Sequence, residues 1–161
     1  MIHRRVFLGL TGAAAAGSLV FFGRSGSAAP TVRFAVNHTP AEWKKRLGPK
    51  RYAVLREAAT EMPFTSPLLK EHRRGTFLCA GCARPLFSSA TKFESGTGWP
   101  SFWKPLPGAV VTRADRSLMM ERTEVLCARC GGHLGHLFDD GPKPTGLRYC
   151  MNGLALNFRA A

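Results

Sequence analysis

Cys79-Ala80-Gly81-Cys82 and Cys127-Ala128-Arg129-Cys130 are two C-x-x-C motifs with the same two-residue gap, and they decide how this chain folds. A tight turn of this spacing points two sulfurs at one ion, so two such turns supply the four thiolates of a tetrahedral structural zinc. A redox dithiol or a pair of disulfides is the alternative reading of these cysteines. The matching gaps favour a single Zn²⁺ bound by Cys79, Cys82, Cys127 and Cys130.

The fifth cysteine, Cys150, is left over from this set. It follows His133 and His136 in the chain, and an unassigned cysteine near histidines is a candidate nucleophile. A histidine that titrates near neutral pH suits proton donation during attack by sulfur. The spacing alone leaves two alternatives open, because a free cysteine is often a small buried apolar residue and the histidines can be structural residues beside a turn.

The first residues of the chain have the composition of a targeting signal. Arg4-Arg5 precedes an apolar stretch rich in Ala and Gly that reaches Phe22. This pattern is typical of a twin-arginine export signal, and Gly26-Ser27-Ala28 suits a peptidase that leaves Ala29 as the first mature residue. A permanent membrane anchor is the alternative, but glycines interrupt the short apolar run.

The rest of the chain is long enough for one domain. With 161 residues, of which 45% are hydrophobic, the protein can build one compact core. We therefore expect a signal peptide at residues 1–28, a short mature arm at 29–38 and a domain at 39–161, exported to the periplasm.

The charge of the chain does not indicate a nucleic-acid binder. The formal net charge is +13, and loss of three arginines with the signal leaves +10. These charges are spread along the mature chain, without the basic stripe and interleaved aromatic residues of a single-strand binding groove. The excess favours a general attraction to acidic surfaces, and we expect no nucleic acid as a partner.

The front of the mature chain shows helix signals. Thr39-Pro40-Ala41-Glu42 is a capping box with proline at the first helical position, which predicts a short helix that ends at Gly48. A second helix should start at Pro49 and end at Pro63. At helical spacing its apolar face would hold four residues and would exclude Val54. The four are Tyr52, Leu55, Ala59 and Met62.

From Gly75 onward the pattern is that of short strands. Apolar or alternating runs predict four of them. They are Val110-Val111-Thr112, Leu118-Met119-Met120, Glu124-Val125-Leu126 and a final run with Leu154, Leu156 and Phe158 on one face. The domain should therefore be mainly β, with short helices at its N-terminus.

Three stretches of the chain together carry a family resemblance. The first two are Cys79-Ala80-Gly81-Cys82 with Pro85-Leu86-Phe87, and Gly96-Thr97-Gly98-Trp99-Pro100-Ser101-Phe102. The third runs from His133-Leu134-Gly135-His136 through Phe138-Asp139-Asp140-Gly141-Pro142 to Arg148-Tyr149-Cys150-Met151-Asn152. In this order they resemble the B-type methionine sulfoxide reductases, which are specific for the R epimer at sulfur. The resemblance covers about residues 39 to 158 and implies two antiparallel sheets with a zinc-binding pair of knuckles.

The resemblance implies the catalytic residues. Cys150 would attack the sulfoxide sulfur, while His133, His136 and Asn152 would surround the sulfoxide oxygen. The chemistry agrees, because attack at sulfur places negative charge on the oxygen and calls for a nearby proton donor.

The resemblance also implies substrate-binding residues. Trp99 would line the pocket for the methyl group, and Phe138 and Arg148 would bind substrate beside it. By residue type alone, Trp99 could equally be a core tryptophan. Arg148 lies two residues before the thiol, on its side of a strand, where it could lower the thiol pKa; a solvated arginine is the alternative.

The chain departs from the family's pattern at two positions. Thr97 stands where many members have a second, resolving cysteine, so an external thiol or a thioredoxin-fold protein should reduce the sulfenic acid on Cys150. Gly153 stands where the family often has serine, and it should loosen the strand that follows Asn152.

The sequence thus predicts an exported, monomeric, zinc-stabilised enzyme that reduces methionine-R-sulfoxide in oxidised proteins. Two alternatives stay open. A zinc-ribbon binding module would explain the knuckles and the charge but not Cys150, and an inactive family member could bind oxidised methionine without reducing it.

Overall fold

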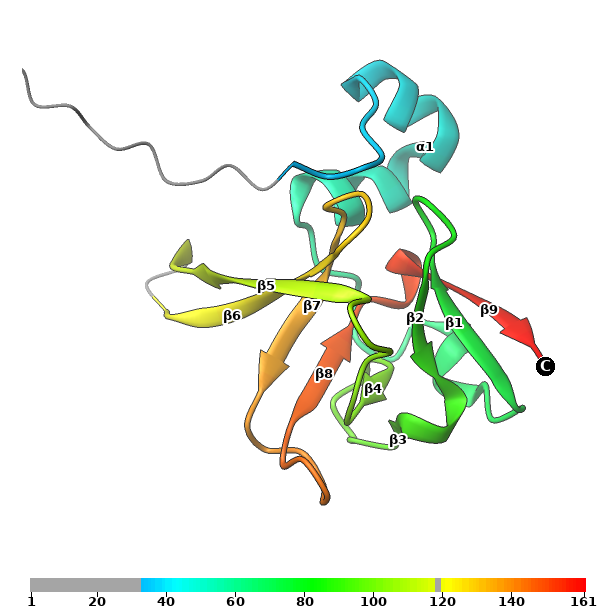
Figure 1. Cartoon of the computed structure of the whole chain (residues 1–161), viewed down its shortest axis with the longest axis vertical. Helices are drawn as coiled ribbons and strands as arrows, with labels where there is room; N and C mark the ends of the chain where they lie inside the picture. Colours follow the sequence, from blue (N-terminus) through cyan, green and yellow to red (C-terminus); the bar gives the residue numbers. More distant parts are fainter. Residues whose placement is uncertain (1–32, 118–119) are drawn as a thin grey trace, which may run out of the picture. The chain divides into compact units, whose positions relative to one another are not determined.

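The protein is mainly β, with one long helix at the front of the described chain (Figure 1). A computed structural model describes residues 33–117 and 120–161. The strands of these residues form a three-stranded sheet, in the order β2-β1-β9, and a six-stranded sheet, in the order β3-β4-β8-β7-β6-β5. All strand pairs are antiparallel, which confirms the predicted fold class.

The elements follow one another along the chain with short connections. They are α1 (Pro40–Glu57), η1 (Pro67–Lys70), β1 (Gly75–Cys79), β2 (Pro85–Ser88), η2 (Ser89–Thr91), β3 (Lys92–Phe93), β4 (Ser101–Phe102), β5 (Val110–Asp115), β6 (Arg122–Cys127), β7 (His133–Phe138), β8 (Arg148–Met151), η4 (Gly153–Ala155) and β9 (Leu156–Ala160).

The start of α1 is the predicted capping box. The Thr39 backbone N–H donates to the Glu42 carboxylate over 2.8 Å, and the Glu42 backbone N–H donates to the Thr39 hydroxyl over 3.3 Å. Gly48 has a φ of 68° and a ψ of 171°, so it breaks the helical path, and Pro49 opens the second half of α1. The predicted break at Gly48 is confirmed. The two predicted helices form one element with a kink at this residue.

The predicted apolar face of the second half is wrong. The helix ends at Glu57, because Ala58 takes a left-handed conformation with a φ of 54°. Ala59 and Met62 therefore lie beyond the helix, and the Met62 side chain is 72% exposed. Val54, which the predicted stripe excludes, is buried together with Leu55.

Two of the four predicted strands agree with the structure, and the other two differ from it. The runs at 110–112 and 124–126 lie within β5 and β6. Of the predicted strand at 118–120, Leu118 and Met119 lie outside the described residues, and Met120 is not in a strand. Leu154 lies in the short helix η4, so the last strand begins only at Leu156.

Gly153 has a different role from the predicted loosening of a strand. It lies in η4, and a Cβ atom on it would come within 1.8 Å of Ser66 Oγ and 2.5 Å of Ser66 Cβ. Ser66 is buried, and its hydroxyl accepts a hydrogen bond from the Leu68 backbone N–H at the start of η1. Glycine at position 153 therefore allows two segments to pack in direct contact.

Three phenylalanines join the two sheets. Phe77 in β1 and Phe87 in β2 belong to the small sheet, and Phe102 in β4 belongs to the large one; all three are fully buried. The rings of Phe87 and Phe102 stack with centroids 4.3 Å apart, and Phe77 meets Phe102 edge to face at 4.9 Å. This packing fixes β4 and its neighbour β8 against the small sheet.

Among the described residues, none of the helices combines the length and the apolar character needed to cross a membrane. The predicted export signal, its cleavage site and the first residues of the mature arm lie outside these residues.

Candidate functional site

Cys150 lies in the middle of the large sheet. In β8 it pairs directly with His136 of β7 on one side and with Ser101 of β4 on the other. Directly paired residues of antiparallel strands share a face of the sheet, so these side chains lie on the face of Cys150. Gly135 permits this arrangement, because a Cβ atom on it would come within 2.1 Å of the Cys150 carbonyl oxygen.

A cavity opens beside Cys150. Its volume is about 140 Å³. It is lined by Thr60, Trp99, Arg122, Gly135, His136, Phe138, Cys150 and Asn152. Five of the predicted site residues therefore meet around one cavity, in which an indole, a phenyl ring and a thiol face a small space.

Arg148 does not line this cavity, and it is buried, so it is not the solvated arginine of the alternative reading. Its guanidinium donates to both carboxylate oxygens of Asp140, over 2.7 and 2.8 Å, and lies 4.3 Å from the centre of the Phe138 ring. The hydrogen bonds to Asp140 are the main cause that raises the pKa of Arg148, and the nearby Cys150 sulfur acts in the same direction. Arg148 thus holds Phe138 at the cavity wall.

Each of the two histidines hydrogen-bonds to a carboxylate. His133 Nδ1 lies 2.6 Å from Glu124 Oε1, and His136 Nε2 lies 2.8 Å from Asp115 Oδ2. Such a pair holds the ring in place and fixes its orientation. Burial lowers the pKa of His133, and hydrogen bonds, from Ser117 first and then His136, lower the pKa of Asp115.

The two ring nitrogens of His133 are in different environments. His133 Nε2 is buried and has no hydrogen-bond partner among the described residues. His133 does not line the Cys150 cavity; it lines an adjacent one of about 350 Å³. The two cavities share Thr60, Arg122 and His136, so His133 lines the cavity next to that of the thiol.

The Asn152 amide is held from both ends. Its Oδ1 accepts from the Glu61 backbone N–H over 2.8 Å, and its Nδ2 donates to the Leu134 carbonyl over 3.2 Å. An amide nitrogen carries two hydrogens, so one remains for a ligand in the cavity. Trp99 is fixed by the same segment, because its Nε1–H donates to the Glu61 carbonyl over 2.9 Å.

The sequence analysis missed three acidic residues that order this site. They are Glu61, Asp115 and Glu124. Glu124 had a signal in the sequence, because a carboxylate inside the apolar strand run 124–126 requires a partner when that strand is buried. Glu61 and Asp115 had no such signal in the sequence, since their hydrogen-bond partners are distant in the chain.

Thr97 lies next to Cys150. Its hydroxyl oxygen is 3.8 Å from the Cys150 sulfur and 2.8 Å from the Ser95 hydroxyl. The Ser95 hydroxyl in turn lies 2.7 Å from that of Ser101. A short chain of hydroxyl groups therefore ends at the thiol.

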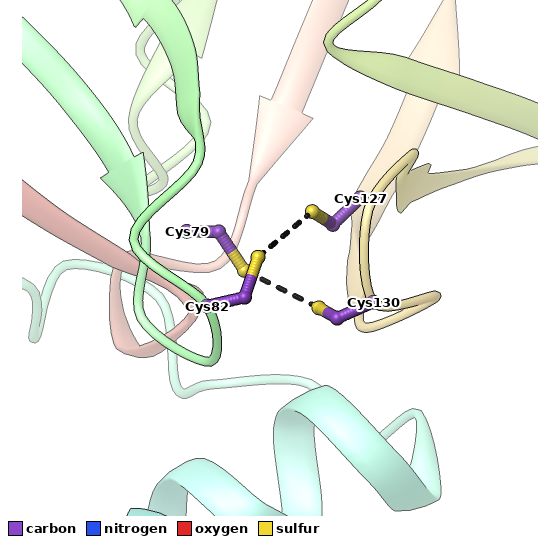
Figure 2. A group of neighbouring side chains, drawn as sticks. All are labelled: Cys79, Cys82, Cys127 and Cys130. Atoms are coloured by element: carbon purple, nitrogen blue, oxygen red, sulfur yellow. Dashed lines mark hydrogen bonds between the residues drawn. The ribbon is translucent and has the colours of Figure 1, made fainter. Parts of the chain in front are cut away.

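The four remaining cysteines form one cluster between two turns, as Figure 2 shows. Cys79 ends β1 and Cys82 lies in the turn that follows it, while Cys127 ends β6 and Cys130 lies in the turn that follows that strand. The Cys79 and Cys130 sulfurs are 3.7 Å apart, the Cys82 and Cys127 sulfurs 3.6 Å, and none of the four cysteines forms a disulfide. A tetrahedral zinc with bonds of about 2.3 Å separates its sulfurs by about 3.8 Å. The cluster therefore fits zinc, and the disulfide alternative is wrong.

The turn with Cys127 and Cys130 contacts the segment before α1 and α1 itself. The Val36 backbone N–H donates to the Arg129 carbonyl over 3.0 Å, and the Arg56 guanidinium donates to the Cys130 carbonyl over 2.9 Å. A Cβ atom on Gly131 would come within 2.4 Å of the Phe34 ring. The cluster thus fastens the front of the chain to the large sheet.

Comparison with known proteins places this site in a family. The SelR domain model matches residues 47–160. The peptide methionine sulfoxide reductase MsrB of Leptospira interrogans is 54% identical over 129 residues, which cover 80% of this chain and 98% of that protein. The MsrB of Agrobacterium fabrum is 52% identical over 124 residues, 76% of this chain and 92% of the relative. The chloroplastic peptide methionine sulfoxide reductase B1 of Arabidopsis thaliana is 51% identical over 120 residues, 74% of this chain and 59% of the relative. The chain therefore belongs to the SelR-domain family, the peptide methionine sulfoxide reductases of the MsrB type.

Proposed function

We propose that this protein reduces methionine-R-sulfoxide in oxidised proteins to methionine, with Cys150 as the nucleophile. The observation that carries the proposal is the cavity of about 140 Å³ in which Cys150 meets Trp99, Phe138 and His136. An indole and a phenyl ring suit the methyl and methylene groups of the side chain, and the polar groups suit its oxygen. Cys150 is also the one cysteine of the sequence outside the four-sulfur cluster.

The first step reduces the substrate and oxidises the enzyme. The Cys150 thiolate attacks the sulfoxide sulfur and forms a sulfur–sulfur bond, while the sulfur–oxygen bond breaks and the oxygen takes up two protons and leaves as water. A water molecule then attacks the Cys150 sulfur, the sulfur–sulfur bond breaks, methionine leaves and one proton is released. In net terms, one thiol and one sulfoxide give one sulfenic acid on Cys150 and one thioether.

The two histidines act on the sulfoxide oxygen and on a nearby water molecule. His136 lines the cavity, and its hydrogen bond to Asp115 holds the ring in place, so His136 can act as the proton donor as negative charge develops on the oxygen. His133 lines the adjacent cavity, and its buried Nε2, which has no partner among the described residues, can bond to a water molecule there. The free N–H of Asn152 can donate a further hydrogen bond to the oxygen.

An external thiol then restores the enzyme. It attacks the sulfenic acid to give a mixed disulfide and water, and a second thiol releases Cys150 as a thiol together with a disulfide. Thr97 cannot form a disulfide, and the cluster cysteines are held with one another. The reductant should therefore be a small thiol or an exposed thioredoxin-fold protein.

The four-cysteine cluster holds Zn²⁺ in this proposal, bound by Cys79, Cys82, Cys127 and Cys130. A zinc held by four thiolates has no open position for a substrate, so its contribution is to the fold.

We further propose that the twin-arginine segment exports the folded, zinc-loaded protein to the periplasm. Exchange of Arg4 and Arg5 for lysine tests this, because the pathway recognises the arginine pair and not only its charge. The precursor of this double variant should stay in the cytosol, whereas unchanged export would support another route.

The stereospecific assay tests the activity. The mature zinc protein is mixed with a small dithiol and with either the R or the S epimer of a methionine sulfoxide peptide. We expect methionine from the R epimer alone, and no product from either epimer with Cys150→Ser. A folded wild-type protein that produces no methionine would instead support a binding module or an inactive family member.

A further inference from the structure

A strap of residues 58–65 separates two hollows on the surface of the protein. On one side lies the Cys150 cavity, and on the other lies a groove of about 470 Å³ along the second half of α1. Thr60 lines both, and it is exposed between them. The groove therefore begins where the proposed substrate cavity ends.

The lining of this groove is mostly apolar. It includes Ala53, Val54, Ala59, Met62, Pro67 and Leu154. Two charged residues, Lys50 and Glu61, line the groove. The Glu61 carboxylate already accepts a hydrogen bond from the Leu154 backbone N–H over 3.0 Å. The groove can thus accept an apolar side chain and should disfavour a basic one.

The strap is rigidly tied to the catalytic wall. Glu61 binds Asn152 through its backbone N–H, Trp99 through its carbonyl and Leu154 through its carboxylate. The position of the strap is therefore fixed relative to Cys150. A ligand that occupies both hollows can bind in only one alignment.

The strap also exposes two large apolar side chains. Met62 is 72% exposed and Phe64 is 70% exposed, and they are two of the three exposed large hydrophobic residues in the described part of the chain. Phe64 has a φ of 64°, a conformation that costs a residue with a side chain about 1–2 kcal/mol. Its backbone N–H donates to the Gly98 carbonyl over 2.8 Å, and its ring carbon Cδ2 lies 3.0 Å from the place of a Cβ on Gly98. A strained, exposed phenylalanine next to Trp99 has no role in the core, and it suits contact with a ligand.

A methionine sulfoxide inside a protein reaches the cavity with its own chain on either side. We propose that the groove and the strap residues Met62 and Phe64 form a subsite for an apolar side chain of the substrate polypeptide, close to the oxidised methionine. This inference rests on the proposed function, because it takes the Cys150 cavity as the place of the sulfoxide.

The test compares peptides that differ only beside the methionine-R-sulfoxide. In one set a single leucine is moved along an otherwise alanine peptide; a second set carries lysine and a third only alanine. For the wild-type protein we expect a kcat/KM about tenfold higher for the best leucine position than for alanine, as burial of one apolar side chain allows. Lysine at that position should give no gain over alanine.

The strap variant Met62→Ala combined with Phe64→Ala should lose this preference. Its kcat/KM for the leucine peptide should fall to the value for the alanine peptide, while that for N-acetyl-methionine-R-sulfoxide amide stays within about twofold of wild type. Met120→Ala is the matched control, since Met120 is an exposed methionine outside both hollows, and it should keep the preference.

Two results would overturn the subsite. One is a wild-type protein that reduces the leucine and alanine peptides equally at every position; the other is a strap variant that loses the small amide and the peptide in equal measure. Failure of the proposed function looks different, because the wild-type protein would then not reduce the small amide either. Binding of labelled sulfoxide peptides to the zinc-loaded Cys150→Ser protein tests the subsite without turnover, and equal affinities for the leucine and alanine peptides would contradict it.

Discussion

The hydroxyl oxygen of Thr97 lies 3.8 Å from the sulfur of Cys150, on the segment that precedes Trp99. A residue at position 97 can therefore touch the nucleophile directly. This contact connects the proposed chemistry of Cys150 with the way in which the enzyme is regenerated, because only a thiol at that place could close a disulfide without rearrangement of the fold.

Thr97→Cys should introduce a resolving cysteine. After one turnover with R-sulfoxide and no reductant, we expect a disulfide between positions 97 and 150, and faster recycling by thioredoxin-like donors that attack disulfides. Non-reducing mass mapping of the peptides shows the bond. Thr97→Ser is the matched control, and it should form none; a stable sulfenic acid in the Thr97→Cys protein would contradict the proximity argument.

His136→Ala should slow the sulfoxide step by about 10²-fold or more, the usual scale for loss of a positioned proton donor. Asp115→Asn should cause a smaller loss, because an amide at position 115 keeps a hydrogen bond to the ring but holds it less firmly than a carboxylate does. Single-turnover rates of sulfoxide consumption measure both. An unchanged rate for His136→Ala would remove this histidine from the mechanism.

Gly153→Ala should destabilise the protein by about 1–3 kcal/mol, since the new methyl group overlaps Ser66. Ser66→Gly in the same chain removes the overlapping atoms and should restore part of the loss. Denaturant unfolding of the two single variants and the double variant gives the coupling energy. Additive losses would show that the close approach of these residues does not limit stability.

Cys79→Ser should lose zinc and unfold much of the protein, because a structural zinc contributes about 10 kcal/mol or more of apparent binding energy. Metal analysis and circular dichroism measure the two effects. Cys150→Ser should keep both zinc and fold. A folded, active preparation that contains no zinc would contradict the structural role of the cluster.

Local signals in the sequence predicted much of this fold. The capping box at Thr39 and the break at Gly48 depend on residues within one or two turns, and both are confirmed. Ala58 is different, because alanine carries no signal for the left-handed conformation that ends the helix. The sequence prediction therefore extended the apolar face of the helix past Ala58 to Met62. In the structure Met62 lies on the strap of residues 58–65.

The site was predictable as a list of residues but not as a network. The motifs and the family resemblance named Cys150, Trp99 and Asn152, which the fold brings to one cavity. Glu61 lies 91 positions from Asn152 in the chain, and no short pattern announces their hydrogen bond. Contacts of this kind depend on how distant segments pack, which single-sequence patterns do not encode.

Mass spectrometry after a single turnover tests the central claim most directly. The mature zinc protein receives R-sulfoxide without a reductant, and its cysteines are then mapped with a reagent selective for sulfenic acids. We expect one added oxygen on Cys150, no intramolecular disulfide and full retention of zinc. A loss of two hydrogens that maps to a bond between Cys150 and a cluster cysteine, with release of zinc, would contradict the separation of a reactive sulfur from a structural metal.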